Sequence, residues 1–287
     1  MDCISTVICG DYQHYIPFFV LSAKGWIKNV DVNIFLYESL DDTTVEAIGY
    51  LENSGIINKI NIKENVFKKR NPNQVNSLRF LVSEGIDDYD TTLITDIDFL
   101  VFEDPVHWHN EEMLLSYKPF AGHHGARKHP MRTEISKDGW VGSFERTCGG
   151  MFAVNKKWYS MTHDARVYFM KNLDMSCTYR EHDEVMLSRI IKLIGYDVPH
   201  IKNFYRDIRL IHLGDFRANM EHRYKNTKKL SKRISKTTAE NYNNLIKTKE
   251  FKDIFDIMKR SDIIKTVFGN LNKYMRLRDE QVHTEHT

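Results

Sequence analysis

The chain has 287 residues, a formal net charge of +2 at neutral pH, and 41% hydrophobic and 12% aromatic residues. This length and apolar content are enough for one large core or for a domain with an appendage, and they exclude wholesale disorder. The charge is uneven, because the segment 217–236 contains eight Lys and Arg residues and one Glu, a local charge of +7 in an otherwise mildly acidic chain.

The first half of the sequence alternates predicted strands and helices. Alternating or β-branched apolar runs predict strands, and apolar residues at helical spacing predict helices. The expected strands are residues 5–9, 31–37, 59–63 and 92–97, and the expected helices are residues 15–24, about 42–53 and 73–84. This order predicts an α/β fold with a mixed, mainly parallel sheet flanked by helices.

The second half is less regular. Residues 120–146 are rich in His, Gly and charge and predict a long loop or lid. We expect a strand with two glycines at 147–154, a helix at 181–193, a strand within 204–212, helical structure at 237–268 and a loose last dozen residues. The expected domains are a nucleotide-binding and catalytic part, 1–215, and a basic, mostly helical extension, 216–287.

The four cysteines form no CxxC pair and no zinc spacing, which favours a reducing compartment. No signal peptide and no apolar stretch of membrane-spanning length is apparent. We therefore expect a cytoplasmic protein that is at most peripheral to a membrane.

Two aspartates, Asp96 and Asp98, interrupt the apolar run at the end of the fourth predicted strand. Residues two apart in a strand point to the same side, and sheets of this kind bind ligands at the carboxyl ends of their strands. Two carboxylates at this spacing suit Mg²⁺ or Mn²⁺, although an Asp-x-Asp also arises by chance. A second one, Asp88 and Asp90, lies among polar turn residues. Neither GxGxxG nor a P-loop follows the first strand.

The stretch NSLRFLVSEGIDDYDTTLITDIDFLVFEDP resembles the segment around the Asp-x-Asp (DXD) motif of GT-A fold nucleotide-sugar glycosyltransferases. It is most similar to the retaining glycogenin-like and lipopolysaccharide-galactosyltransferase-like group. Further pieces follow in the family's order: GGMFAVNKKW at 149–158, EHDEVML at 181–187 and HLG at 212–214. The resemblance covers about residues 5–214, and EHDEVML departs from the family's usual spelling.

The resemblance implies a metal site made by Asp96, Asp98 and His212. This site would hold Mn²⁺ or Mg²⁺ across the two phosphates of a nucleotide-diphosphate sugar, most often a UDP-sugar. Arg79, on the helix before the motif, would lie beside the phosphates or the donor sugar as a fixed cation. Asp96 would also turn toward the ribose.

The resemblance also implies the remaining donor contacts. Asp11 and Tyr12 would meet the base and the ribose, and Gly149 and Gly150 would allow the backbone to approach the sugar. Asp183, Glu184 or His182 would bind sugar hydroxyls or act on the acceptor.

Each residue also has a structural alternative. Asp183 and Glu184 open a predicted helix, where the dipole favours acids, and His212 could be a core or turn histidine. Arg79 could be solvated, and the glycines could mark a bulge. A histidine cluster invites a zinc interpretation that no Cys or HExxH pattern supports. The cluster consists of His107, His109, His123, His124 and His129.

The leading hypothesis is a metal-dependent glycosyltransferase acting on a glycan such as lipopolysaccharide or capsule. A phage-type enzyme acting on modified bases of DNA is the first alternative, since the basic segment 217–236 could hold any polyanion or an anionic membrane surface. A nucleotidyltransferase, or a non-catalytic nucleotide- or carbohydrate-binding module, is the second.

Overall fold

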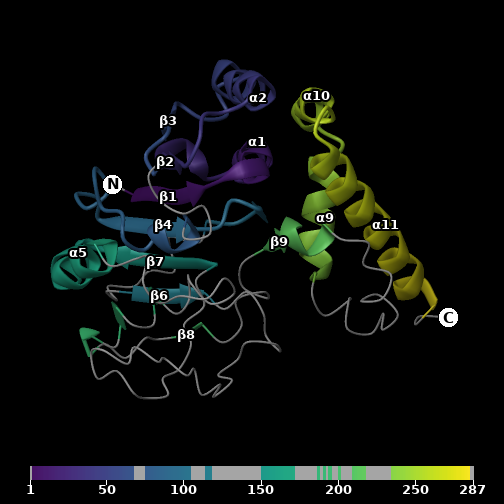
Figure 1. Ribbon diagram of the computed structural model, residues 1–287. Helices are drawn as coiled ribbons and strands as arrows, with labels where there is room; N and C mark the ends of the chain where they lie inside the picture. Colours follow the sequence, from purple (N-terminus) through teal and green to yellow (C-terminus); the bar gives the residue numbers. More distant parts are fainter. Residues whose placement is uncertain are drawn as a thin grey trace.

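The computed structural model describes residues 2–67, 75–104, 114–117, 150–171, 186–187, 190–191, 193–195, 200–201, 209–217 and 234–284. These form a seven-stranded sheet of order β3-β2-β1-β4-β7-β6-β8, and a separate two-stranded sheet, β5-β9 (Figure 1). The strands are β1 Asp2–Ile8, β2 Asp31–Leu36, β3 Ile60–Lys63, β4 Thr91–Thr95, β5 Phe99–Val101, β6 Leu114–Tyr117, β7 Met151–Asn155, β8 His200–Ile201 and β9 Leu210–His212.

The sheet is mostly parallel, as the sequence predicts. β1 lies between β2 and β4 and pairs in parallel with both, and β3 pairs in parallel with β2. β7 runs antiparallel to β4 and to β6, while β8 is parallel to β6. The carboxyl ends of β1, β2 and β4 therefore meet at one edge, where α/β sheets bind ligands.

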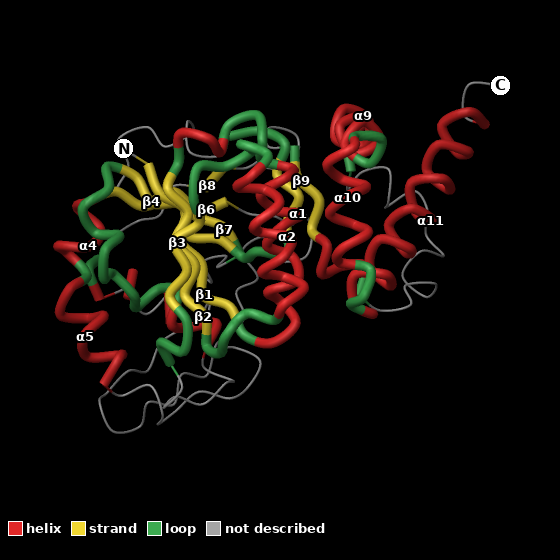
Figure 2. Tube along the Cα trace, turned by 90° about the horizontal axis from the view of Figure 1, so that it is seen from above, coloured by secondary structure: helices red, strands yellow, loops and turns green. Residues whose placement is uncertain are grey.

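Helices lie on both sides of this sheet. In Figure 2, α1 (Ile16–Ser22) and α2 (Asp42–Asn53) lie on one side, and α4 (Lys156–Met161) and α5 (His163–Lys171) lie on the other. All seven residues of α1 are buried, which fits a run with no polar face. The α2 helix begins where the Asp41 side chain accepts a hydrogen bond from the Thr44 amide.

Three expected elements differ in extent. The helix predicted at 73–84 is only α3, Val75–Leu78; beyond it the Phe80 and Leu81 amides donate to carbonyls three residues back, as in a turn. The glycine-containing strand begins at Met151, so Gly150 precedes it. The fourth strand ends at Thr95, so Asp96 and Asp98 lie in the connection to β5 rather than inside a strand.

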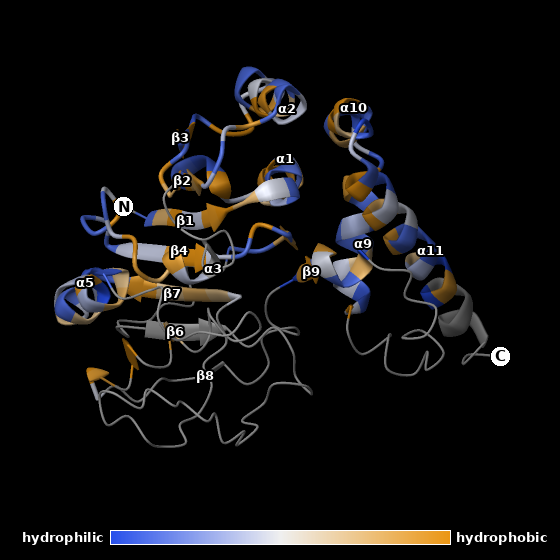
Figure 3. Ribbon diagram, viewed as in Figure 1, coloured by the Kyte–Doolittle hydropathy of each residue, from blue (hydrophilic) through white to orange (hydrophobic). Residues whose placement is uncertain are grey.

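The described C-terminal residues form three amphipathic helices, seen in Figure 3 as alternating hydrophilic and hydrophobic bands. They are α9 Lys236–Leu245, α10 Lys249–Met258 and α11 Asp262–Thr284. The Phe18 ring of α1 lies 5.8 Å from Phe251 and 4.5 Å from Phe268, centroid to centroid. These helices share one hydrophobic cluster with the sheet. The expectation of a loose end is wrong as far as Thr284, because α11 continues to that residue. None of the described helices is both long and apolar enough to cross a lipid bilayer.

Candidate active site

A cavity of about 270 Å³ opens at the carboxyl edge of β1 and β4. Sequence analysis proposed four of its lining residues, Tyr12, Asp96, Asp98 and His212, and the fold brings them together. The full lining is Val7, Ile8, Cys9, Tyr12, Asp96, Ile97, Asp98, His212, Gly214 and Arg217. The lining residues therefore come from three separate stretches of the chain, 7–12, 96–98 and 212–217.

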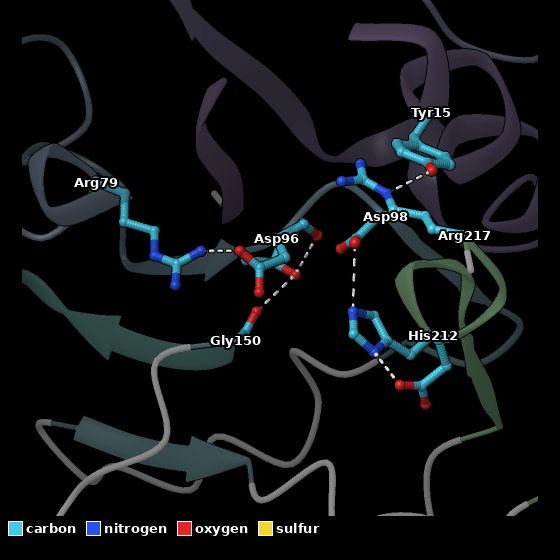
Figure 4. A network of polar contacts seen from close by, with 9 residues as sticks. Tyr15, Arg79, Asp96, Asp98, Gly150, His212 and Arg217 are labelled. Atoms are coloured by element: carbon cyan, nitrogen blue, oxygen red, sulfur yellow. Dashed lines mark hydrogen bonds and ion pairs between the residues drawn. The ribbon is translucent and has the colours of Figure 1, made fainter. Parts of the chain in front are cut away.

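The two aspartates face different partners (Figure 4). Asp96 accepts a hydrogen bond from the buried guanidinium of Arg79, and its amide donates to the Gly150 carbonyl at 2.7 Å. The Asp98 carboxylate instead lies 3.3 Å from His212, measured from Oδ2 to Nε2. The Asp96 side chain is 31% exposed and the Asp98 side chain only 4%. Asp96 thus faces solvent while Asp98 forms the buried base of the cavity.

Strand pairing places Asp98 and His212 together. Phe99 and His212 are register partners in the β5-β9 ribbon, so His212 arrives beside the residue that precedes β5. The Leu213 amide then donates to the Asp98 carbonyl at 2.7 Å and closes the turn. This long-range antiparallel pairing brings together two residues that are 114 positions apart in the sequence.

The electrostatics of this pair favour opposite charges. Burial alone would raise the pKa of Asp98, but His212 and Arg217 together lower it. Burial would lower the pKa of His212, but Asp98 and Asp215 raise it. The metal-free pair is therefore an ion pair at neutral pH, with Asp215 Oδ1 3.6 Å from His212 Nδ1.

Gly214 leaves room for this pair. A Cβ at Gly214 would lie 2.5 Å from Asp98 Oδ2 and 2.9 Å from His212 Nε2, closer than real Cβ contacts. The chain therefore needs glycine here for the close approach of its backbone to two polar atoms. The HLG motif thus contributes the His212 side chain and, at Gly214, the room that this side chain and Asp98 need.

Arg217 is the main site residue that sequence analysis missed. Its guanidinium lies 3.9 Å from the ring centroid of Tyr12, and its Nε donates to the Tyr15 hydroxyl at 2.8 Å. Burial raises the pKa of both tyrosines, so their hydroxyls stay protonated near neutral pH. The sequence analysis treats Arg217 only as the first cation of the basic segment. The signal that could have indicated a site residue is its position three residues after Gly214.

Other expected site residues lie apart from the cavity or outside the described chain. Asp11 is exposed on η1 (Gly10–Tyr15) and is not part of the lining. Gly149, Asp183 and Glu184 lie outside the described residues, as do His182, the histidine cluster and segment 218–233.

The cavity fits a divalent cation in part. Asp98 Oδ1 is buried and has no hydrogen-bond partner among the described residues. A carboxylate oxygen beside an imidazole nitrogen is a donor set that Mn²⁺ accepts, and Mg²⁺ accepts the carboxylate. Within the described ranges, no three His, Cys, Asp or Glu side chains are placed to hold a metal. An ion held by Asp98 and His212 would therefore complete its shell with substrate oxygens and water.

No protein-family model matches the chain, and no curated protein matches it. Among solved structures, the apo form of the bifunctional glycosyltransferase WbbM aligns with a TM-score of 0.50 and 9% identity, over 88% of this chain and 51% of that chain. GlyE of Streptococcus pneumoniae TIGR4 aligns at 0.44 and 11%, over 95% and 64%. A galactosyltransferase LgtC complex with donor and acceptor sugar analogues aligns at 0.41 and 19%, over 66% and 70%.

The chain shares the α/β fold of a solved glycosyltransferase structure. The alignment with WbbM carries this statement, since it spans most of the present chain. The alignment spans about half the length of WbbM, and the likeness concerns the fold alone.

Proposed function

We propose that the chain is a metal-dependent glycosyltransferase that moves a sugar from a nucleotide-diphosphate donor, most often UDP-linked, to a hydroxyl of a glycan. One observation supports this function above the others: a buried carboxylate, Asp98, faces His212 in a cavity at the carboxyl edge of the sheet. Asp98 Oδ1 has no hydrogen-bond partner among the described residues, although a buried carboxylate oxygen normally has one.

In this proposal Asp98 and His212 hold Mn²⁺ or Mg²⁺, and Asp96 adds negative charge at the rim. The ion supplies Lewis-acid stabilisation of the charge that develops on the departing diphosphate. The imidazole favours Mn²⁺ over Mg²⁺, because nitrogen ligands suit transition metals better. Asp98 Oδ2 and His212 Nε2, now 3.3 Å apart, would be the atoms nearest to such an ion.

The chain contributes two fixed cations beside this site. Arg217 lines the cavity, and Arg79 is 3% exposed and held against Asp96. Arginine in a water-poor site is suited to bind phosphate oxygens through two parallel hydrogen bonds. We assign Arg217 to the diphosphate and Arg79 to the donor side, where it also orients the Asp96 carboxylate.

The nucleoside would lie toward η1. Tyr12 lines the cavity at the end of β1, and Arg217 covers one face of its ring. Asp11 lies next to it but is exposed, so it would reach a ligand only from the rim. Burial and Glu38 raise the pKa of the Cys9 thiol, which disfavours its thiolate form.

Other expected roles stay proposals. Asp183 and Glu184 would bind donor-sugar hydroxyls or act on the acceptor, and Gly149 and Gly150 would let the backbone approach the sugar. The basic segment 217–236 would hold a polyanionic glycan such as lipopolysaccharide or capsule. As alternatives, the positive charge of this segment would bind DNA with modified bases or an anionic membrane surface.

The test is donor hydrolysis without acceptor, since glycosyl transfer to water needs only the donor site. The purified chain is mixed with UDP-, GDP- and dTDP-sugars, with Mn²⁺ or with EDTA, and release of the nucleoside diphosphate is measured. Mn²⁺-dependent release from one donor supports the proposal and names the sugar. Silence across the panel together with no Mn²⁺-dependent nucleotide binding contradicts it.

A further inference from the structure

Two of the described segments that line the cavity, one near each end of its lining, contact the long C-terminal helix α11. These segments are η1, which contains Tyr12, and η5 (Leu213–Phe216), which stands between His212 and Arg217. Figure 1 shows α11 extending past β9, on the side of the molecule away from the sheet. The cavity therefore has one wall that depends on a helix more than 45 residues later in the sequence.

The η5 segment is attached to α11 by a hydrogen bond and a ring contact. Asn270 Nδ2 donates to the Phe216 carbonyl at 2.9 Å. The Phe216 ring meets Tyr274 edge to face, with centroids 5.6 Å apart and planes at 62°. Phe216 and Tyr274 are 5% and 2% exposed, so this contact is protected from water. It fixes the backbone of the residue directly before Arg217.

The η1 segment is attached to the start of the same helix. His14 lies between Ser261 and Asp41, with Nδ1 2.8 Å from Ser261 Oγ and Nε2 2.6 Å from Asp41 Oδ2. Ser261 directly precedes α11, and Asp41 caps α2. The loop that contains Tyr12 and Tyr15 is therefore held between α2 and α11.

Arg217 joins the two attached segments across the cavity. It starts from the end of η5 and reaches Tyr12 and Tyr15 of η1. A side chain with this reach has many rotamers, and its placement depends on where its backbone is fixed. The start of η5 is fixed by the Leu213 amide, which donates to the Asp98 carbonyl. The end of η5 is fixed by Asn270.

We propose that α11 positions the phosphate-binding arginine of the site, with Asn270 as a positioning residue that acts through Arg217. Its effect on ligands depends on the proposed function, while its effect on η5 does not. Removing the Asn270 donor would let η5 shift and would withdraw Arg217 from the cavity. The C-terminal helices are then part of the donor site rather than an independent appendage.

The experiment compares two isosteric changes on one helix. Asn270→Asp replaces the donor by an oxygen that repels the Phe216 carbonyl. Asn272→Asp adds the same charge two residues away but keeps the acceptor for the Tyr242 hydroxyl, 2.7 Å distant. Calorimetry measures UDP binding with Mn²⁺, and hydrogen exchange measures the amides of residues 210–217. Both changes are repeated in an Arg217→Gln background.

We expect Asn270→Asp to weaken UDP binding about tenfold, the scale of one lost hydrogen bond, and Asn272→Asp to change it less than about threefold. In the Arg217→Gln background, Asn270→Asp should have no further effect, since the two residues act as a unit. Equal weakening in both backgrounds, or no weakening, would overturn the positioning role.

The two proposals can fail separately. If the parent protein binds no nucleotide, the proposed function fails and hydrogen exchange alone decides the role of α11. Faster exchange of η5 in Asn270→Asp, but not in Asn272→Asp, then supports the positioning role. Equal exchange rates in both variants overturn it.

Discussion

Gly214 and Asp98 are so close that the smallest side chain at Gly214 would collide with the carboxylate. A Cβ added to Gly214 would lie only 2.5 Å from Asp98 Oδ2. Gly214→Ala should therefore push apart the Asp98–His212 pair and weaken Mn²⁺-dependent nucleotide binding by about tenfold or more, as loss of metal-ligand positioning usually does. Calorimetry with UDP and Mn²⁺ measures this change.

The matched control is Gly269→Ala. Gly269 lies on an exposed face of α11, and a Cβ there would meet nothing within 4 Å. Because alanine is the better helix former, this variant should gain about 0.5–1 kcal/mol of stability and bind as the parent does. Parent-like binding by Gly214→Ala would show that the close contact has no role in the site.

Arg217→Gln tests the assigned diphosphate contact. The change removes a cation that lines the cavity and stacks on Tyr12, so we expect UDP affinity to fall about 10- to 100-fold while uridine affinity changes little. Arg260→Gln is the control, since Arg260 is 65% exposed and pairs with Glu46 on the surface. An equal loss for UDP and uridine would contradict the diphosphate assignment.

The Asp98–His212 ion pair predicts how metal-free stability depends on pH. Burial disfavours the charged form of His212, but Asp98 and Asp215 raise the pKa of His212 from 6.5 to about 10. The stability that the charged imidazole gives to the fold is therefore complete below pH 6.5 and is lost as pH rises toward 10. Burial would raise the pKa of Asp98, but His212 lowers it below 3.8. The stability that the Asp98 carboxylate gives to the fold is therefore lost only as pH falls below 3.8.

The check is chemical denaturation in EDTA at pH values of about 6, 8 and 10, for the parent and for His212→Gln. The difference in unfolding free energy between the two proteins should shrink steadily from the lowest to the highest of these pH values. A constant difference over this range would mean that folding does not raise the pKa of His212.

Ser22 links α1 to β5 beneath the site. Its buried hydroxyl accepts a hydrogen bond from the Val101 amide at 2.8 Å and donates one to the Phe19 carbonyl at 2.8 Å. Ser22→Ala leaves a buried amide unpaired and should cost about 1–3 kcal/mol of unfolding free energy, measured in urea. Ser160→Ala, at an exposed position of α4, should cost less than about 0.5 kcal/mol. Equal costs would contradict the role given to Ser22.

The local pattern was enough to predict β1 to β4, α1 and α2, because most residues of β1, β2 and β4 form short buried runs bounded by turn residues. The pattern failed at residues 80–82, where apolar residues at helical spacing follow α3 as a turn instead of extending it. It failed again at α11, whose buried positions continue through Arg278 beyond the strongly apolar stretch.

The site was predictable only in part. Asp96 and Asp98 are conspicuous because they interrupt an apolar run, and His212 was proposed from its resemblance to a family motif. For Arg217 the local sequence offers only its position three residues after Gly214, since its role arises from contacts with Tyr12 and Tyr15, about 200 residues away. Likewise, nothing in the sequence around Asn270 indicates that its amide supports Phe216.

The most direct test of the account is UDP binding by calorimetry in Mn²⁺ and in EDTA, for the parent, Asp98→Asn and Asp88→Asn. Asp88 belongs to the other Asp-x-Asp and is exposed. We predict Mn²⁺-dependent binding by the parent and by Asp88→Asn, and at least about tenfold weaker binding by Asp98→Asn. UDP binding that neither EDTA nor Asp98→Asn weakens would contradict the metal site and with it the proposed function.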